Sequence, residues 1–203
     1  MSRKGFTNDA IPALSLVESP IEGKFVQSFF DLMREQGFTH SYRNEERSAF
    51  SVIFKNSEQF PNFSYKLVSQ AQFEDPNIGR VDFLVAAYTG DEGELCAVEL
   101  DGAEFHSSPD AQKRDRIKDR RFIELDSFCL RYAGKEVFAS ARKCVDEVIT
   151  ILREKIDAKE ASSRFSFESG IEVGIKKASN MTAIELALKV KEFAPYEYNE
   201  QEE

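Results

Sequence analysis

Residues 79–106 read GRVDFLVAAYTGDEGELCAVELDGAEFH. Two apolar runs, 81–88 and 95–100, lie on either side of a short segment that contains Gly90 and Gly93. Such runs favour strands, and a short glycine-containing connection between them is typical of a hairpin. In this hairpin Asp82 begins one strand and Glu99 ends the next. We therefore expect both carboxylates at the same open end of a sheet.

The sequence on either side of this hairpin predicts alternating helices and strands. Ser19-Pro20 and Ser107-Ser108-Pro109-Asp110 each place a capping hydroxyl before a proline, which is typical of a helix start. The apolar spacing then predicts these elements: a helix from Pro20 to about Gly37, strands at 51–54, 66–73, 81–88 and 95–100, a helix at 111–125, a strand at 128–132 and a helix at 135–159. This order indicates an α/β protein with a central sheet flanked by helices.

The length of 203 residues and the hydrophobic content of 41% suit one globular domain. We expect an N-terminal arm at 1–18, the domain at 19–160 and a C-terminal extension at 161–203. The extension begins as a connector rich in serine, contains a further helix at 181–193 and ends in an acidic tail.

Composition excludes several classes of function. The net charge of −9 argues against a general nucleic-acid coat protein, although a local basic patch can still bind phosphate. No run approaches eighteen apolar residues and no signal-peptide pattern opens the chain, so we expect a cytoplasmic protein without a membrane partner. Cys96, Cys129 and Cys144 are isolated in apolar segments, which indicates reduced core thiols. Without a glycine-rich phosphate loop, Cys-x-x-Cys pairs or a nucleophile elbow, kinases, zinc fingers and serine hydrolases are poor candidates.

The paired carboxylates point to metal chemistry. Two carboxylate oxygens suit a hard cation, so we expect a site for Mg²⁺, with Mn²⁺ as a substitute. Such a cation polarises a phosphodiester and activates water for its hydrolysis.

The chain resembles the PD-(D/E)XK, restriction-endonuclease-like nucleases, and within them the very-short-patch-repair and DUF559-type endonucleases. The resemblance covers about 19–156 and lies in Val81-Asp82-Phe83, Val98-Glu99-Leu100-Asp101-Gly102, His106, Arg114-Asp115 and Leu130-Arg131-Tyr132. It implies a mixed central sheet flanked by helices, entered by a helix whose acidic residue faces the site. It also implies a Mg²⁺-dependent endonuclease that hydrolyses DNA.

The resemblance assigns roles to single positions. Asp82 and Glu99 match the two acidic metal ligands, and the backbone carbonyl of Leu100 is a third candidate ligand. Glu22 matches the acidic residue of the first helix, although a first-turn carboxylate is also favoured by the helix dipole alone. His106 matches a histidine that shuttles a proton, or it closes the turn before the next helix.

Two positions depart from the motif. Val81 stands where the family name has proline, and Asp101 stands where a lysine is expected two residues after Glu99. Asp101 binds metal, orients His106 or forms an ordinary Asp-Gly turn. The missing cation has candidate replacements on the following helix, Lys118, Lys113 and Arg114, of which Lys118 is our catalytic candidate.

Substrate contact is assigned to a basic surface. Lys113 and Arg114 belong to the densest cluster of positive charge in the chain, which is either a phosphate-binding surface or a solvated helix face. Gln70 and Arg80 are expected near the same edge of the sheet.

Three functions remain open from the sequence. The first is a DNA endonuclease that works in repair, restriction or defence against mobile elements. The second is a nuclease-fold binding or assembly module that has lost catalysis, and the third is an RNA-directed nuclease, because the metal site does not distinguish the sugars. The protein is expected to be a monomer or a homodimer.

Overall fold

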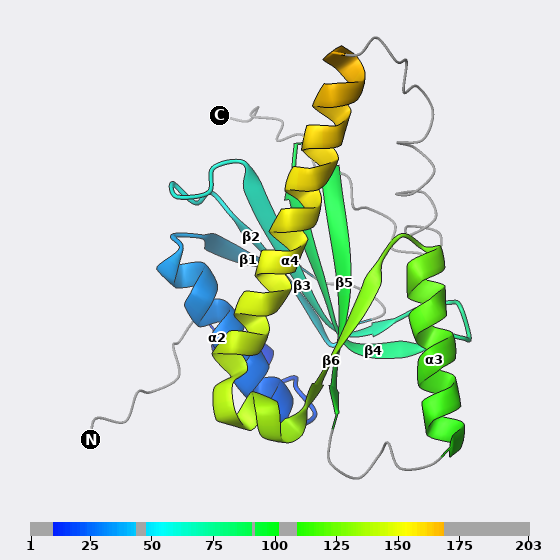
Figure 1. Ribbon diagram of the computed structural model, residues 1–203. Coiled ribbons are helices and arrows are strands. Elements are labelled where there is room, and N and C mark those ends of the chain that lie inside the picture. The colour runs from blue at the N-terminus through cyan, green and yellow to red at the C-terminus, as the bar shows by residue number, and fades with distance from the viewer. Residues whose placement is uncertain (1–9, 44–47, 91, 102–108, 169–203) are drawn as a thin grey trace, which may run out of the picture.

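The computed structural model of the protein describes residues 10–43, 48–90, 92–101 and 109–168 (Figure 1). These residues form an α/β structure around a six-stranded mixed sheet in which the strands follow one another in sequence order, from β1 to β6. Neighbouring strands from β1 to β5 are antiparallel, and β6 is parallel to β5. The strands are β1 (Thr39–Arg43), β2 (Phe50–Lys55), β3 (Phe63–Gln72), β4 (Arg80–Thr89), β5 (Glu92–Asp101) and β6 (Phe128–Ala133).

Helices cover both faces of this sheet. They are α1 (Ile11–Leu14), α2 (Pro20–Glu35), α3 (Pro109–Glu124) and α4 (Gly134–Glu168). One hydrophobic core joins α2 and α4 to one face of the sheet, and a second core, on the opposite face, includes Phe122 of α3. A parallel strand pair needs a crossover connection, and α3 provides it between β5 and β6.

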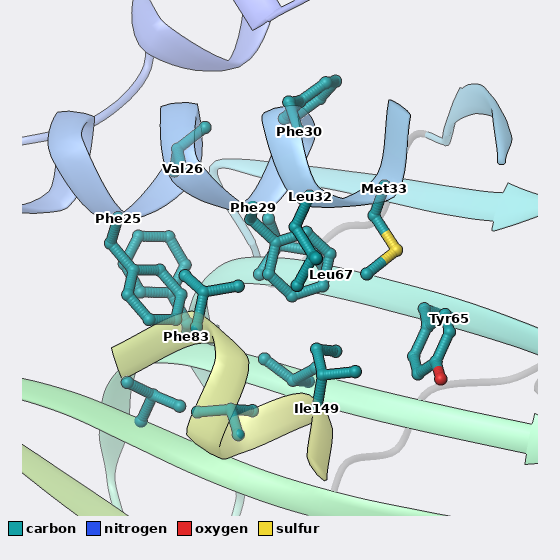
Figure 2. Packing of buried hydrophobic residues seen from close by; sticks show 14 of the residues in the cluster. Phe25, Val26, Phe29, Phe30, Leu32, Met33, Tyr65, Leu67, Phe83 and Ile149 are labelled. Atoms are coloured by element: carbon teal, nitrogen blue, oxygen red, sulfur yellow. The ribbon is translucent and has the colours of Figure 1, made fainter. Parts of the chain in front are cut away.

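The larger core is rich in phenylalanine. Figure 2 shows Phe25 and Phe29 of α2 directed toward the sheet and toward α4. The ring of Phe25 stacks on Phe83 of β4 with a centroid separation of 5.1 Å. Such contacts fix α2 across the sheet, so that its N-terminus lies beside the first residues of β4.

Most elements agree with the sequence predictions. Ser19 caps α2 and accepts a hydrogen bond from the amide of Glu22, with Pro20 in the first turn. The expected strands, the two later helices and the mixed character of the flanked sheet are all confirmed. No helix in the described part of the chain is both long enough and apolar enough to cross a membrane.

The ends of the described chain differ in detail from the expected elements. Within the expected arm at 1–18, α1 forms and Ala10 and Ala13 are buried in the larger core. Helix α4 continues to Glu168, into the range where a connector was expected from residue 161. The helix expected at 181–193 lies outside the described residues.

In a regular strand, side chains alternate between the two faces of the sheet. This alternation is interrupted in β3 and in β4, at positions that lie opposite each other. Leu67 and Phe83 belong to the larger core, whereas Ala71 and Val81 belong to the core on the α3 face, although an even spacing keeps residues on one face of a regular strand. Ser69 pairs with Phe83 and Ala71 pairs with Val81, so Gln70 and Asp82 face each other at the break. Gln70 has a φ of 54°, which is uncommon for a residue other than glycine.

Helix α3 is attached to the sheet by one fully buried apolar side chain among its described residues. Phe122 is 1% exposed and its ring meets Phe73 edge to face at 5.6 Å. We expect Phe122→Ala to reduce the free energy of unfolding by about 3 to 5 kcal/mol, because it leaves a cavity between α3 and the sheet. Urea denaturation followed by circular dichroism measures this change. The neighbouring Ile123→Ala, at a position 70% exposed, is the control and should change stability by less than about 0.5 kcal/mol.

Candidate functional site

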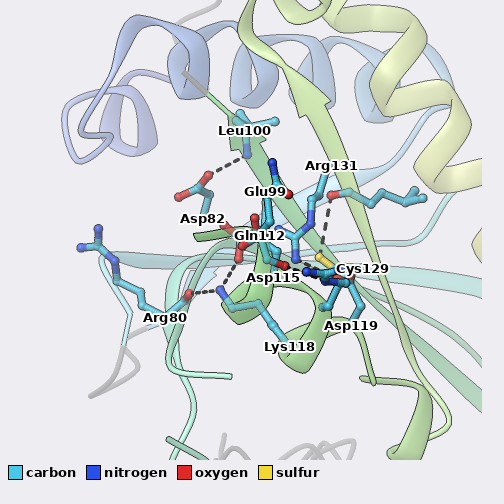
Figure 3. Close-up of polar contacts among 12 residues, drawn as sticks. Arg80, Asp82, Glu99, Leu100, Gln112, Asp115, Lys118, Asp119, Cys129 and Arg131 are labelled. Carbon is cyan, nitrogen blue, oxygen red and sulfur yellow. Dashed lines mark hydrogen bonds and ion pairs between the residues drawn. The ribbon is translucent and has the colours of Figure 1, made fainter. Parts of the chain in front are cut away.

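Asp82 lies where β4 and β5 separate. The last pair of the β4–β5 ladder at this end is Phe83 with Val98, and the next two residues are Asp82 and Glu99. The Asp82 Oδ2 atom accepts a hydrogen bond of 2.7 Å from the backbone amide of Leu100 (Figure 3). The hairpin thus brings Asp82 and Glu99 to the same end of the sheet, as the sequence predicts.

The carboxyl group of Asp82 holds its proton more tightly than an ordinary aspartate. Its pKa is raised from 3.8 to about 6, chiefly by burial; the Leu100 amide lowers it, the negative charges of Glu99 and Glu22 raise it, and the positive charge of Arg80 lowers it. Two neighbouring carboxylates thus oppose ionisation of Asp82, and Arg80 partly offsets them. A bound cation would relieve this repulsion.

Glu99 lies on the α3 face of β5, where Lys118 reaches it. The Lys118 ammonium nitrogen is 2.5 Å from Glu99 Oε1 and donates a second hydrogen bond of 2.9 Å to the Arg80 carbonyl (Figure 3). The Lys118 and Glu99 side chains are only 17% and 14% exposed. Among the three candidates for the missing motif lysine, the structure brings Lys118 to Glu99 and leaves Lys113 and Arg114 exposed on α3.

Arg131 of β6 is the neighbour of Glu99 in the parallel register of β5 and β6. Its guanidinium is 2.7 Å from Asp119 and 3.9 Å from Asp115, both on α3. The resemblance included Arg131 but the sequence assigned it no role. The sequence did contain a sign that Arg131 forms an ion pair, because it lies between two apolar residues of a predicted strand. A charged residue at such a place needs a partner from a neighbouring element.

Glu22 is buried at the N-terminus of α2. Its Oε1 atom accepts a hydrogen bond from the Ser19 hydroxyl, and its Oε2 atom accepts from the Glu18 amide and from Gln70 Nε2, at 2.9, 3.1 and 3.0 Å. This reciprocal arrangement with Ser19 caps the helix. Glu22 acts electrostatically on Asp82, as an acidic residue near the site should, while its expected role as a metal ligand stays a prediction.

Gln70 and Arg80 are placed differently from one another. Gln70 is 7% exposed and directs its amide to Glu22, so its position favours support of the site over the expected contact with nucleic acid. No described residue pairs with its Oε1 atom. Arg80 is exposed at the edge of the site and forms an ion pair with Glu18 at 3.1 Å.

The donor set at this end of the sheet fits magnesium. Across 10–43, 48–90, 92–101 and 109–168, no three His, Cys, Asp or Glu side chains converge to form a complete metal cage. Mg²⁺ does not need one, since one or two carboxylates suffice when water and substrate phosphate fill the remaining positions. Asp82 and Glu99 provide such a pair, and the Leu100 carbonyl as a further ligand remains a prediction.

Asp101 and His106 are the remaining candidate site residues. Asp101 follows Glu99 by two residues in β5, so alternation places it on the same face as Glu99. His106 lies outside the described residues, and its role as a proton shuttle stays a prediction.

The cysteines belong to the packing of the protein. All three are free, and burial raises the pKa of the Cys129 thiol to about 12. A thiol must ionise to act as a nucleophile or metal ligand. Cys96 and Cys144 are buried in the core as expected, whereas Cys129 is only partly buried.

Comparisons of the chain with family models, with curated proteins and with solved structures found no match. The geometry of the site therefore carries the functional argument.

Proposed function

We propose that this protein is a metal-dependent endonuclease of the PD-(D/E)XK kind that hydrolyses phosphodiester bonds in DNA. The observation that carries the proposal is the contact of Lys118 with Glu99 beside Asp82. Lys118, on α3, would supply the positive charge that the motif normally places at the position of Asp101. Two acidic side chains and one cation then meet at the end of a hairpin.

The arrangement of elements gives further support. A helix with a buried acidic residue, Glu22, precedes the strands and borders the site, and a mixed sheet is covered by helices on both faces. Both features are those that the resemblance to the PD-(D/E)XK nucleases implies. Fold alone does not fix an activity, so the proposal depends on the site residues.

Each residue has a defined task in this proposal. Asp82 and Glu99 would hold Mg²⁺, or Mn²⁺ in its place, with the Leu100 carbonyl as a third donor. When bound, the cation supplies positive charge to the phosphate and makes the attacking water more acidic. Lys118 places a second positive charge beside Glu99, where it stabilises the negative charge that builds up on the phosphate oxygens as the new P–O bond forms and the ester bond breaks.

The surface of α3 supports a nucleic acid as the substrate. The helix carries six cationic and four acidic residues, an excess of +2 in a chain with a net charge of −9. Lys113, Arg114, Arg116 and Arg120 are exposed, on the same helix that brings Lys118 to the site. Positive charge at this place would hold the phosphate backbone next to the carboxylates.

Plasmid cleavage tests the proposal. Supercoiled DNA incubated with the protein and Mg²⁺ or Mn²⁺ should be nicked, since one active site cuts one strand, and EDTA should prevent this. Asp82→Ala should remove the activity. Equal cleavage by the variant would contradict the site, and single-stranded RNA incubated in parallel would reveal a ribonuclease. An inert wild type that also binds no Mg²⁺ by titration calorimetry would instead indicate a binding or assembly module.

A further inference from the structure

The position of Lys118 depends on how α3 is held against the sheet. Phe122 is buried one turn after Lys118, while the half of the helix before Lys118 has no fully buried apolar side chain among its described residues. Apolar packing therefore anchors one end of α3. Another interaction has to fix the turn that carries Lys118.

Arg131 provides that interaction. Its guanidinium lies between Asp115 and Asp119, which are one helical turn apart on α3 and lie on either side of Lys118 in sequence. In β6 it is also the direct neighbour of Glu99, the residue that Lys118 contacts. Arg131 thus joins the turn of α3 that carries Lys118 to the strands β5 and β6, the first of which carries Glu99.

We propose that Arg131 is a positioning residue that clamps α3 to β6 and so sets the Lys118 ammonium against Glu99. The significance of this clamp for catalysis rests on the proposed nuclease function, whereas the clamp itself is a property of the folded protein. The guanidinium of Arg131 is hydrogen-bonded to Asp119 and has the Asp115 carboxylate 3.9 Å away, so these two carboxylates offset much of its positive charge. The planar guanidinium spans two carboxylates, which a lysine at this position cannot do.

Acylation of lysines by an N-hydroxysuccinimide ester, read out by peptide mass spectrometry, measures the clamp without reference to activity. In the wild type, Lys118 should react more slowly than Lys113, an exposed lysine on the same helix. Arg131→Met should accelerate acylation of Lys118 by about tenfold, as expected for the loss of a charge-assisted hydrogen bond, and leave Lys113 unchanged. An unchanged rate at Lys118 would overturn the proposal.

Two further variants separate a specific clamp from general loosening of the helix. Asp119→Asn should reproduce most of the effect of Arg131→Met, because Asp119 is the nearer of the two carboxylates. The double variant should show no larger effect than Arg131→Met alone, since Arg131→Met already removes the interaction with Asp119. Asp119→Asn also tests the clamp if Arg131→Met does not fold, because Asp119 is more exposed than Arg131. Arg121→Met breaks the ion pair of α3 with Asp75 and is the control. If Arg121→Met accelerated acylation of Lys118 as much as Arg131→Met does, a specific role for Arg131 would be overturned.

Cleavage kinetics give the second readout. Arg131→Met should lower kcat by about 100-fold at an unchanged KM, because a catalytic group displaced by about 1 Å loses most of its effect on the transition state. Arg131→Lys should recover part of this loss through a single ion pair. A rise in KM alone would overturn the positioning role and indicate substrate binding. Failure of the wild type to cleave would contradict the nuclease function, and the acylation rates would still decide on the clamp.

Discussion

Replacing Lys118 by methionine is expected to slow phosphodiester cleavage by about 100- to 1000-fold, the usual effect of removing one group that stabilises transition-state charge. Methionine retains much of the length of the side chain and removes the ammonium that lies 2.5 Å from Glu99. Single-turnover cleavage of supercoiled plasmid at saturating Mg²⁺ measures this rate. Saturation with metal ensures that the rate reports on chemistry and not on metal binding.

The same variant is expected to bind Mg²⁺ more tightly than the wild type. Lys118 occupies Glu99 Oε1, an oxygen that a cation at this site would otherwise attract. Removal of the ammonium leaves the carboxylate unpaired in a largely buried position, so a divalent cation gains the interaction. Titration calorimetry of the free protein measures the affinity.

A matched variant on the same helix distinguishes the two lysines. Lys113 is exposed, so Lys113→Met should raise KM for DNA and leave Mg²⁺ affinity unchanged. For Lys118→Met, opposite changes in metal affinity and cleavage rate are the signature of a catalytic cation. Weaker metal binding together with slower cleavage would show that Lys118 only maintains the structure of the site.

Asp82→Asn should remove cleavage and, in the presence of EDTA, make the protein more stable at neutral pH. Because the folded-state pKa of Asp82 is raised to about 6 from 3.8, its contribution to stability is fully present below pH 3.8 and is lost as the pH rises through 6. Each pKa unit corresponds to about 1.4 kcal/mol, and partial exposure to water reduces the expected gain from asparagine to about 2 kcal/mol at pH 7.5. Asparagine avoids the buried charge and keeps an oxygen for the Leu100 amide.

Urea unfolding at pH 4 and at pH 7.5 measures this difference. The gain should vanish at the lower pH, where wild-type Asp82 is largely protonated, and Mg²⁺ should stabilise the wild type but not the variant. Asp157→Asn, an exposed substitution on α4, is the control and should change stability by less than about 0.5 kcal/mol at either pH. If Asp82→Asn were less stable than the wild type at pH 7.5, the ionised Asp82 carboxylate would not destabilise the folded protein.

Much of the fold was predictable because local signals and burial agree. Ser19-Pro20 determines where α2 begins, and the apolar runs around Gly90 form the hairpin that brings Asp82 and Glu99 together. By contrast, β1 was missed because its sequence THSYR is polar and mostly exposed, and it becomes a strand by pairing with β2. Edge strands need only one partner and carry a weak sequence signal.

The sequence predicted where Asp82 and Glu99 lie in the sheet, but not which side chains surround them. Spacing along α3 left three cations as candidates, and only the docking of the helix on the sheet, with Phe122 buried, shows that Lys118 is the one that contacts Glu99. The left-handed conformation of Gln70 and its hydrogen bond to Glu22 are likewise indicated by no sequence pattern. Such choices depend on contacts between residues far apart in the chain.

The attachment of α3 makes the site sensitive to ionic strength in two ways. Ion pairs of Arg131 and Arg121 hold this helix, and most of the charges involved are partly exposed, where dissolved salt screens them. In the proposed nuclease, the same salt would weaken the attraction between the basic helix surface and the phosphates of the substrate. Raising the ionic strength should therefore loosen Lys118 from Glu99 while it also releases the substrate, so cleavage should fall more steeply with salt than binding does.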